Sequence, residues 1–367
     1  MKHPPQQKMR QVKQLFFQKL SIFLGTLGLF LALAFSSCNL TNYSTASFAQ
    51  PTEFRIGYQV VPNAELLAKN LGLAEAIFPD VKIKWEPFTS GRNVILALAD
   101  NQIDVGLAGS VPAAAAIAQG LPVQVYFIHN LIGDNEALAV TQSSKIDAVQ
   151  DLAGKRIGVP FGSTTHFSLL SALDNTGVSA ENVEILDMQP GMILSAWKRG
   201  IIDGGFIWQP TLNQLVDNQG KVLLTAKELA AQGFVTADLG LVNQEFLNTY
   251  PNFLASYVNV LNAAVQEYRD NPQAAAEAIA PAISLSPEAS LSAMSQLVWL
   301  SATEQTSKDY MGTPDSPGNL GQILRDSAEF MVGQNALPPA PPLETFQAGL
   351  FNQALEQALK QESEPAG

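Results

Sequence analysis

Hydroxyl side chains gather at one predicted turn of this chain, where Gly162 is followed by Ser163, Thr164 and Thr165. The turn lies between a short β-rich run at 156–159 and apolar residues that are spaced as in a helix. A helix start leaves backbone N–H groups without partners and carries partial positive charge. Hydroxyls beside those amides form a pocket for a small oxyanion. The alternative for such a turn is an ordinary N-cap with nothing bound.

The elements that must position these hydroxyls are strands that alternate with helices, one of which is predicted over 64–78. This alternation predicts a parallel, doubly wound α/β sheet. Ligands bind such sheets beyond the carboxyl ends of the strands. Besides Thr164, the polar residues that the pattern places at this edge are Tyr58, Gln59, Ser90 and Ser110.

Two acidic residues stand where the chain crosses between two predicted lobes. Glu136 begins a β-like run near 135–140, and Asp238 lies early in a second run at 236–242. We expect each carboxylate to face the cleft between the lobes. For either acid alone, the alternative is a solvated loop residue, which is the usual place of Asp and Glu.

A short internal echo predicts that the two lobes arose by duplication. The segment 101–106 contains Ile-Asp after a tight turn and leads to a proline-started helix, and 199–205 repeats this order. We interpret the two acids of the echo, Asp104 and Asp203, as turn and cap residues.

The first 38 residues have the layout of a secretory signal peptide. A basic start without acids is followed by an apolar run at 22–35 and by small residues before Cys38, the single cysteine. The run is shorter than the roughly 20 residues that a membrane-spanning helix needs. The residues before Cys38 are similar to a lipobox, which predicts acylation of this cysteine. Cleavage after Ala49 and a retained anchor helix are the alternatives.

Composition and charge exclude several classes of function. Residues 1–38 hold five of the 21 Lys/Arg and none of the 33 Asp/Glu, so the remaining chain has a formal charge of −17. Such a surface repels nucleic acid and anionic lipid, and an anion must be bound by a local site. The sequence shows no metal-ligand cluster, nucleophile elbow, phosphate loop or dinucleotide fingerprint. We therefore expect no cofactor and no catalytic residue.

The last third of the chain is predicted to be helical, with a proline-rich loop at 335–342 and a final helix at 345–360. The resulting domain boundaries are 1–38 for the leader, 39–52 for a tether, 53–135 for the first part of lobe 1, 136–237 for lobe 2, 238–334 for the return to lobe 1, and 335–367 for the loop and C-terminal helix.

Several motifs in collinear order carry a family resemblance between about Phe54 and Val242. The chain resembles the taurine and aliphatic-sulfonate binders of ATP-driven (ABC) importers, and the segment Pro160 to Leu170 is the most specific part. The motifs are Tyr58-Gln59, Phe88-x-Ser90-Gly91, Gly109-Ser110-x-Pro112, Asn135-Glu136-Ala137-Leu138, Gly154-Lys155-Arg156-Ile157, Val159-Pro160-Phe161-x-Ser163-Thr164-Thr165-His166, Ala196-Trp197-x-Arg199-Gly200 and Trp208-x-Pro210.

The resemblance implies a type II periplasmic-binding-protein fold, with two α/β lobes, two crossings and a ligand trapped by closure of the lobes. It further implies a monomer that delivers a small sulfonate to permease subunits, while the leader predicts export to the periplasm or cell surface and the lipobox predicts an anchor at Cys38. Hydroxyls near Ser110, Thr164 and Thr165 suit a sulfonate, while the acids matching Glu136 and Asp238 bind an ammonium in the family. His166 and Trp208 complete the expected site.

Other functions stay open at this point. Where the family carries an aromatic residue two positions after Asp238, this chain has Gly240, which predicts a wider cleft unless Trp208 or Phe234 fills the space. A plain alkanesulfonate or nitrate is an alternative ligand. An enzyme similar to thiamine-pyrimidine synthases is another alternative, but those need a cysteine-rich segment. A ligand sensor that docks on a receptor would have the same sequence features.

Overall fold

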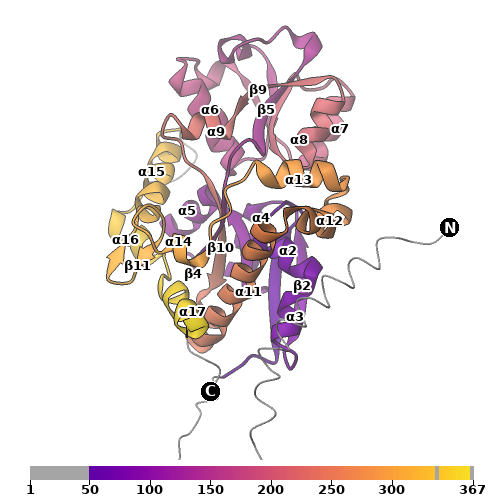
Figure 1. Cartoon of the computed structure of the whole chain (residues 1–367). Coiled ribbons are helices and arrows are strands. Elements are labelled where there is room, and N and C mark those ends of the chain that lie inside the picture. Colours follow the sequence, from indigo (N-terminus) through magenta and orange to yellow (C-terminus); the bar gives the residue numbers. More distant parts are fainter. Residues whose placement is uncertain (1–48, 335–338, 364–367) are drawn as a thin grey trace, which may run out of the picture.

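The computed structural model describes residues 49–334 and 339–363, and two five-stranded sheets form its frame (Figure 1). The first sheet has the order β2-β1-β3-β10-β4, and its lobe is called lobe 1. The second has the order β7-β6-β8-β5-β9 and belongs to lobe 2. The strands are β1 Glu53–Gln59, β2 Lys82–Phe88, β3 Val105–Gly109, β4 Val123–Leu131, β5 Glu136–Thr141, β6 Arg156–Val159, β7 Glu184–Asp187, β8 Gly204–Trp208, β9 Gly220–Thr225 and β10 Ala237–Asn243.

Helices cover the faces of both sheets. Lobe 1 contains α2 Ala64–Leu71, α3 Leu73–Ile77, α4 Gly91–Ala99 and α5 Ser110–Ala118, and lobe 2 contains α6 Thr164–Asn175, α7 Pro190–Lys198, α8 Thr211–Asp217 and α9 Ala226–Ala230. The C-terminal helices are α10 Gln244–Thr249, α11 Pro251–Asp270, α12 Pro272–Ile283, α13 Pro287–Ser295, α14 Ala302–Gln305, α15 Leu320–Gly333, α16 Leu343–Ala348 and α17 Gln353–Ser363. A two-stranded hairpin consists of β11 Gly312–Thr313 and β12 Ser316–Pro317.

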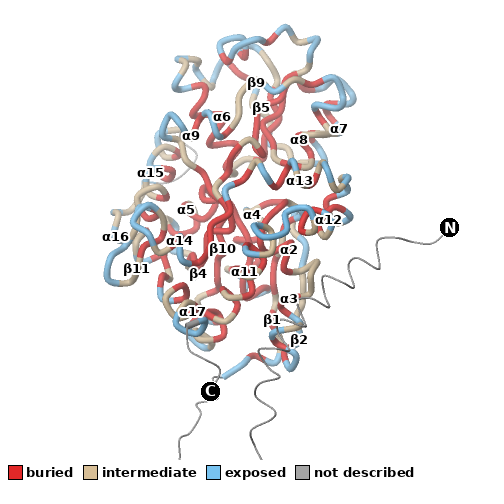
Figure 2. Tube along the Cα trace, viewed as in Figure 1, coloured by how far each residue is buried: buried red, intermediate tan, exposed pale blue. Residues whose placement is uncertain are grey.

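The two sheets share one topology. In lobe 1, β10 lies between β3 and β4 and is antiparallel to both, and in lobe 2 β5 lies in the same way between β8 and β9. These two strands follow the crossings of the chain, because β5 comes directly from lobe 1 and β10 comes directly from lobe 2 (Figure 1). The central strands of both lobes are buried (Figure 2).

The sequence echo corresponds to a repeated ion-pair clamp. In lobe 1, Asp104 accepts hydrogen bonds from the backbone N–H and the guanidinium of Arg55. In lobe 2, Asp203 accepts the same bonds from Arg156. Each pair ties the start of one parallel strand to the start of its neighbour. Both acids are therefore structural residues and lie outside the ligand site.

Two predicted helices are each divided in the structure. The helix expected over 64–78 is broken at Gly72, which adopts φ 68° and donates its N–H to the last turn of α2. The helix expected over 345–360 is two helices, α16 and α17. It is interrupted because Val125 of β4 bonds with Gly349 and Phe351 on either side of Leu350. Pairing with a distant strand thus overrides the local helical pattern.

The predicted leader and lipobox lie outside the described residues. Within 49–334 and 339–363, the structure has no helix with the length and apolar character needed to cross a membrane.

Candidate interlobe binding site

A small polar cavity lies between the two lobes, at the carboxyl ends of the parallel strands. Its volume is about 30 Å³, which is room for about two water molecules. The cavity is lined by Gln59, Val61, Gly91, Leu107, Gly109, Pro112 and Asp238 from lobe 1, by Glu136, Ser163, Thr164 and Trp208 from lobe 2, and by Asn135 just before β5. Taurine is larger than this space.

Three helix N-termini meet at this cavity. Gly91 is the first residue of α4, Gly109 is the N-cap of α5, and Ser163 is the N-cap of α6. The side chain of Ser163 accepts a hydrogen bond from the backbone N–H of His166. Free N–H groups and partial positive charge at three helix starts favour an anionic ligand group.

Two carboxyl groups from the crossing strands face the same cavity. Glu136 begins β5 and is almost fully buried. One of its oxygens accepts a hydrogen bond of 2.7 Å from the Thr164 hydroxyl, and the other has no partner. Asp238 is near the start of β10, and one of its oxygens accepts a bond of 2.9 Å from the Asn130 amide. Thr164, Glu136 and Asp238 therefore share one cavity.

The electrostatics of this pair favour a cationic group beside the acids. Burial raises the pKa of Glu136 to about 8, and the nearby charge of Asp238 adds to this increase. Burial also raises the pKa of Asp238 to about 6. Among the described residues that line the cavity there is no Lys, Arg or His, so the protein itself supplies no counter-charge there. A ligand ammonium would supply it, and the two acids would then ionise more readily.

The anion-binding and cation-binding groups are neighbours in this cavity. The Thr164 hydroxyl, expected to contact a sulfonate, donates directly to the Glu136 carboxylate. The expectation of two opposite ends, one with hydroxyls and one with carboxylates, is therefore too simple for this conformation. The reason is that β5 and α6 both begin at the same side of lobe 2. A ligand with a short spacer between its charged groups suits this arrangement.

Of the residues at the strand ends, the structure places Gln59 in the cavity and Tyr58 outside it. Successive side chains of a strand point to opposite faces, and the Tyr58 ring instead packs near Trp85, at 6.2 Å between centroids, under the Lys69 ammonium. The Gln59 amide donates to the backbone carbonyl of Leu107 at 3.0 Å.

Three expected hydroxyls lie beside the cavity but do not line it. Ser90 is the buried N-cap of α4, and its hydroxyl has no partner. The Ser110 hydroxyl accepts a hydrogen bond from the backbone N–H of Ala237 at 3.2 Å. The Thr165 hydroxyl pairs with that of Ser163 at 2.8 Å. The hydroxyls of Ser110 and Thr165 thus stabilise the local structure beside the cavity.

His166 lines a different hollow. Its ring stacks on Phe161 at 4.5 Å between centroids, and its Nδ1 accepts a hydrogen bond from the backbone N–H of Gly162. Burial lowers the pKa of His166 to about 4, so the ring is neutral near pH 7. The hollow has a volume of about 630 Å³ and is mostly apolar, and α4 and α5 contribute much of its lining.

Gly240, where the resemblance predicts an aromatic residue, does not line the cavity. A Cβ atom on Gly240 would lie 2.9 Å from the ring of Tyr126, which is fully buried in the core of lobe 1. The expected widening of the cleft at Gly240 is therefore wrong for this structure, because the position faces the core. Phe234 does not fill the site either, since it packs near Phe167 and Phe330, whereas Trp208 lines the cavity.

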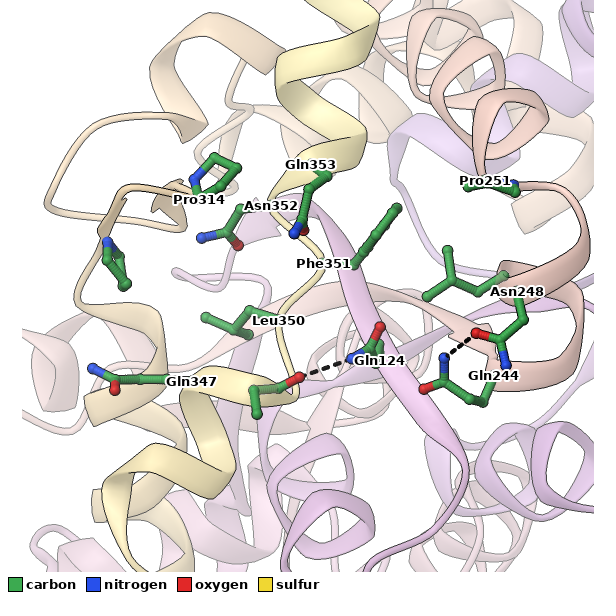
Figure 3. A pocket seen from close by; sticks show the side chains of 13 residues that line it. Gln124, Gln244, Asn248, Pro251, Pro314, Gln347, Leu350, Phe351, Asn352 and Gln353 are labelled. Atoms are coloured by element: carbon green, nitrogen blue, oxygen red, sulfur yellow. Dashed lines mark hydrogen bonds between the residues drawn. The ribbon is translucent and has the colours of Figure 1, made fainter.

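A further hollow of about 550 Å³ lies on lobe 1, away from the crossings (Figure 3). It is lined by amide, proline and apolar side chains between the start of α11 and the segment before α17. Three of these amides, those of Gln124, Gln244 and Asn248, take part in hydrogen bonds. Its lining contains no charged side chain, so it offers no group to bind a small ion. Among the described residues, no cluster of three or more His, Cys, Asp or Glu could bind a metal.

The sequence analysis did not identify Asn130, which contacts Asp238 and belongs to none of the motifs. Gly91, Gly109, Pro112 and Asn135 were visible within motifs but had not been assigned to the site, whereas Ser163 belonged to the predicted hydroxyl turn.

Comparison with known proteins shows the family of this chain. A family model described as NMT1/THI5 like matches residues 80–275. The chain is 34% identical over 262 residues to the taurine-binding periplasmic protein of Escherichia coli strain K12, which covers 70% of this chain and 79% of that protein.

Solved structures show the same fold. The alkanesulfonate-binding protein SsuA from Xanthomonas axonopodis pv. citri, bound to MOPS, has a TM-score of 0.69 at 24% identity and covers 83% of this chain and 99% of that chain. The periplasmic aliphatic sulphonate binding protein SsuA from Escherichia coli has a TM-score of 0.65 at 21% identity and covers 81% and 92%. The predicted periplasmic-binding-protein fold is therefore confirmed.

Proposed function

The chain belongs to the NMT1/THI5-like family, and from this premise we propose that it is the solute-binding protein of an ABC importer for taurine or a related small amino-sulfonate. Closure of the two lobes around the ligand would be the change that the permease senses, a population shift driven by contacts made in the closed state. The taurine-binding relative, which is 34% identical over 262 residues, supports this ligand class.

The observation that carries the proposal is the pair Glu136 and Asp238 in a cavity whose described lining residues include no cationic side chain. Leaving a buried charge unpaired is costly, so a ligand ammonium is the natural partner. The helix starts at α4, α5 and α6 suit the sulfonate. A plain alkanesulfonate or nitrate would gain nothing from the two acids. We propose a binding role without turnover, since the only cysteine is Cys38 and the enzyme alternative needs a cysteine-rich segment.

Calorimetry with purified mature protein tests the ligand class. We expect taurine to bind with one site per chain and to be recovered unchanged. Ethanesulfonate, which has the sulfonate but no ammonium, serves as the matched ligand and should bind much more weakly. Tight binding of nitrate or ethanesulfonate with no heat for taurine would overturn the proposal.

The pH dependence of binding should differ in sign between the two ligand types. Glu136 and Asp238 have pKa values raised to about 8 and about 6, so both lose protons as the pH rises from 5 to 8. An ammonium binds the ionised acids, so taurine affinity should rise over this range and binding at pH 7 should release protons. Ethanesulfonate affinity should fall. Calorimetry in two buffers with different ionisation enthalpies measures the released protons, and parallel pH profiles for both ligands would contradict the assignment.

We further propose export to the periplasm or cell surface with a lipid anchor at Cys38. The predicted leader and lipobox support this. A Cys38→Ala variant should move from the membrane fraction to the soluble fraction, and an unchanged distribution would argue against acylation. We propose that the protein is a monomer and that its partners are the permease subunits. A sensor receptor is the alternative partner.

A further inference from the structure

A buried asparagine contacts one of the two acids from outside the cavity lining. Asn130 lies in β4, directly opposite Asp238 in β10, and is fully buried. Its Nδ2 donates a hydrogen bond of 2.9 Å to Asp238 Oδ2. An ionised carboxylate only accepts hydrogen bonds, so the amide must present its NH2 group to it. The carbonyl oxygen Oδ1 is then turned away, and it is buried without a partner.

The pairing of the strands explains this contact. Asp238 pairs with Asn130, but the next residue, Leu239, pairs with Ile128, so the ladder skips His129. Such an irregularity re-aims side chains next to functional sites. The ladder places Asn130 on one side of Asp238 and Gly109, the N-cap of α5, on the other.

Glu136 and Asp238 therefore accept hydrogen bonds from different kinds of donor. Asp238 receives an amide from its own sheet, whereas Glu136 receives the hydroxyl of Thr164 at the start of α6. Glu136 is also the only other ionisable side chain in the described lining of the cavity. The bond from Asn130 favours the charged form of Asp238 and offsets part of the effect of burial, which raises its pKa to about 6.

We propose that Asn130 is a positioning residue that determines specificity: its amide holds Asp238 ionised and facing the cavity, and so favours ligands with an ammonium over plain sulfonates. The selectivity part rests on the proposed function, whereas the effect on Asp238 does not.

The test uses the mature protein with Asn130→Leu, which removes the donor at similar size, and Asn130→Ala, which removes it without added bulk. Asn352→Leu is the matched control. Asn352 is also buried, donates a bond of 2.9 Å to the Met311 carbonyl, leaves Oδ1 unpaired and lies away from the cavity. Thermal melting confirms that each variant folds.

The first readout is the ¹³C shift of the Asp238 carboxyl in the ligand-free protein as a function of pH. In both Asn130 variants we expect Asp238 to titrate about one pH unit higher, with no change in Asn352→Leu. An unchanged titration would overturn the proposal regardless of any ligand.

The second readout is the dissociation constant across pH 5–9. At pH 5, below the pKa of Asp238 in either protein, the Asn130 variants should bind taurine about tenfold more weakly, as expected for a shift of one pH unit, and the loss should shrink to about twofold at pH 7 and vanish above it. Binding of ethanesulfonate should change less than twofold. Equal losses for both ligands, or a loss that pH does not reverse, would overturn the specificity role. If the unmodified protein binds no amino-sulfonate, the proposed function and the selectivity part fail together, while the titration still decides the effect on Asp238.

Discussion

Replacing Asp238 with Ala is expected to weaken taurine binding by about 2–5 kcal/mol, or roughly 30-fold to several thousand-fold. The change leaves the ligand ammonium with Glu136 as the one acidic partner among the described lining residues of a desolvated cavity. Ethanesulfonate carries no ammonium, so its affinity should stay the same or increase. Titration calorimetry on both ligands measures this difference.

The matched control is Asp134→Ala. Asp134 precedes Glu136 by two residues, but it pairs with Lys227 at 3.2 Å and does not line the cavity. This exposed pair should matter little for binding. Similar losses for taurine and ethanesulfonate in Asp238→Ala, or a large effect of Asp134→Ala on taurine, would mean that Asp238 does not bind the ammonium.

Replacing Gly109 with Ala should weaken ligand binding without unfolding either lobe. The added Cβ would lie 2.7 Å from Cγ2 of Thr164, which belongs to the opposite lobe. Thr164 cannot turn away freely because its hydroxyl bonds to Glu136. Overpacking of this kind costs about 1–3 kcal/mol, so we expect an affinity loss of about 5- to 150-fold. Calorimetry measures the affinity, and X-ray scattering with ligand measures whether the lobes still close.

The backbone of Gly109 has φ −64° and ψ 159°, which any residue adopts, so the melting temperature should change little. Gly191→Ala is the control, because a Cβ on Gly191 in α7 meets nothing within 4 Å. If Gly109→Ala binds taurine and closes as the unmodified protein does, the contact between Gly109 and Thr164 does not limit closure.

Local chemistry was enough to predict most of the frame of this protein. The strand at 156–159, the hydroxyl turn after Gly162 and the start of α6 follow from residue type and spacing, because turns and helix starts depend on neighbours in the sequence. The two crossings were also visible as β-like runs. The resemblance supplied the expected ligand class, which residue patterns alone left open.

The tertiary structure decided which polar side chains meet. Asn130 and Asp238 are 108 residues apart, and their contact depends on a ladder that skips His129, which no local pattern reveals. Tyr58 faces the other side of its strand, and Gly240 faces the core against Tyr126. The physical reason is that hydrophobic periodicity and turn residues determine where a strand ends. Where each side chain points depends on how the strands pair and how the two lobes pack together.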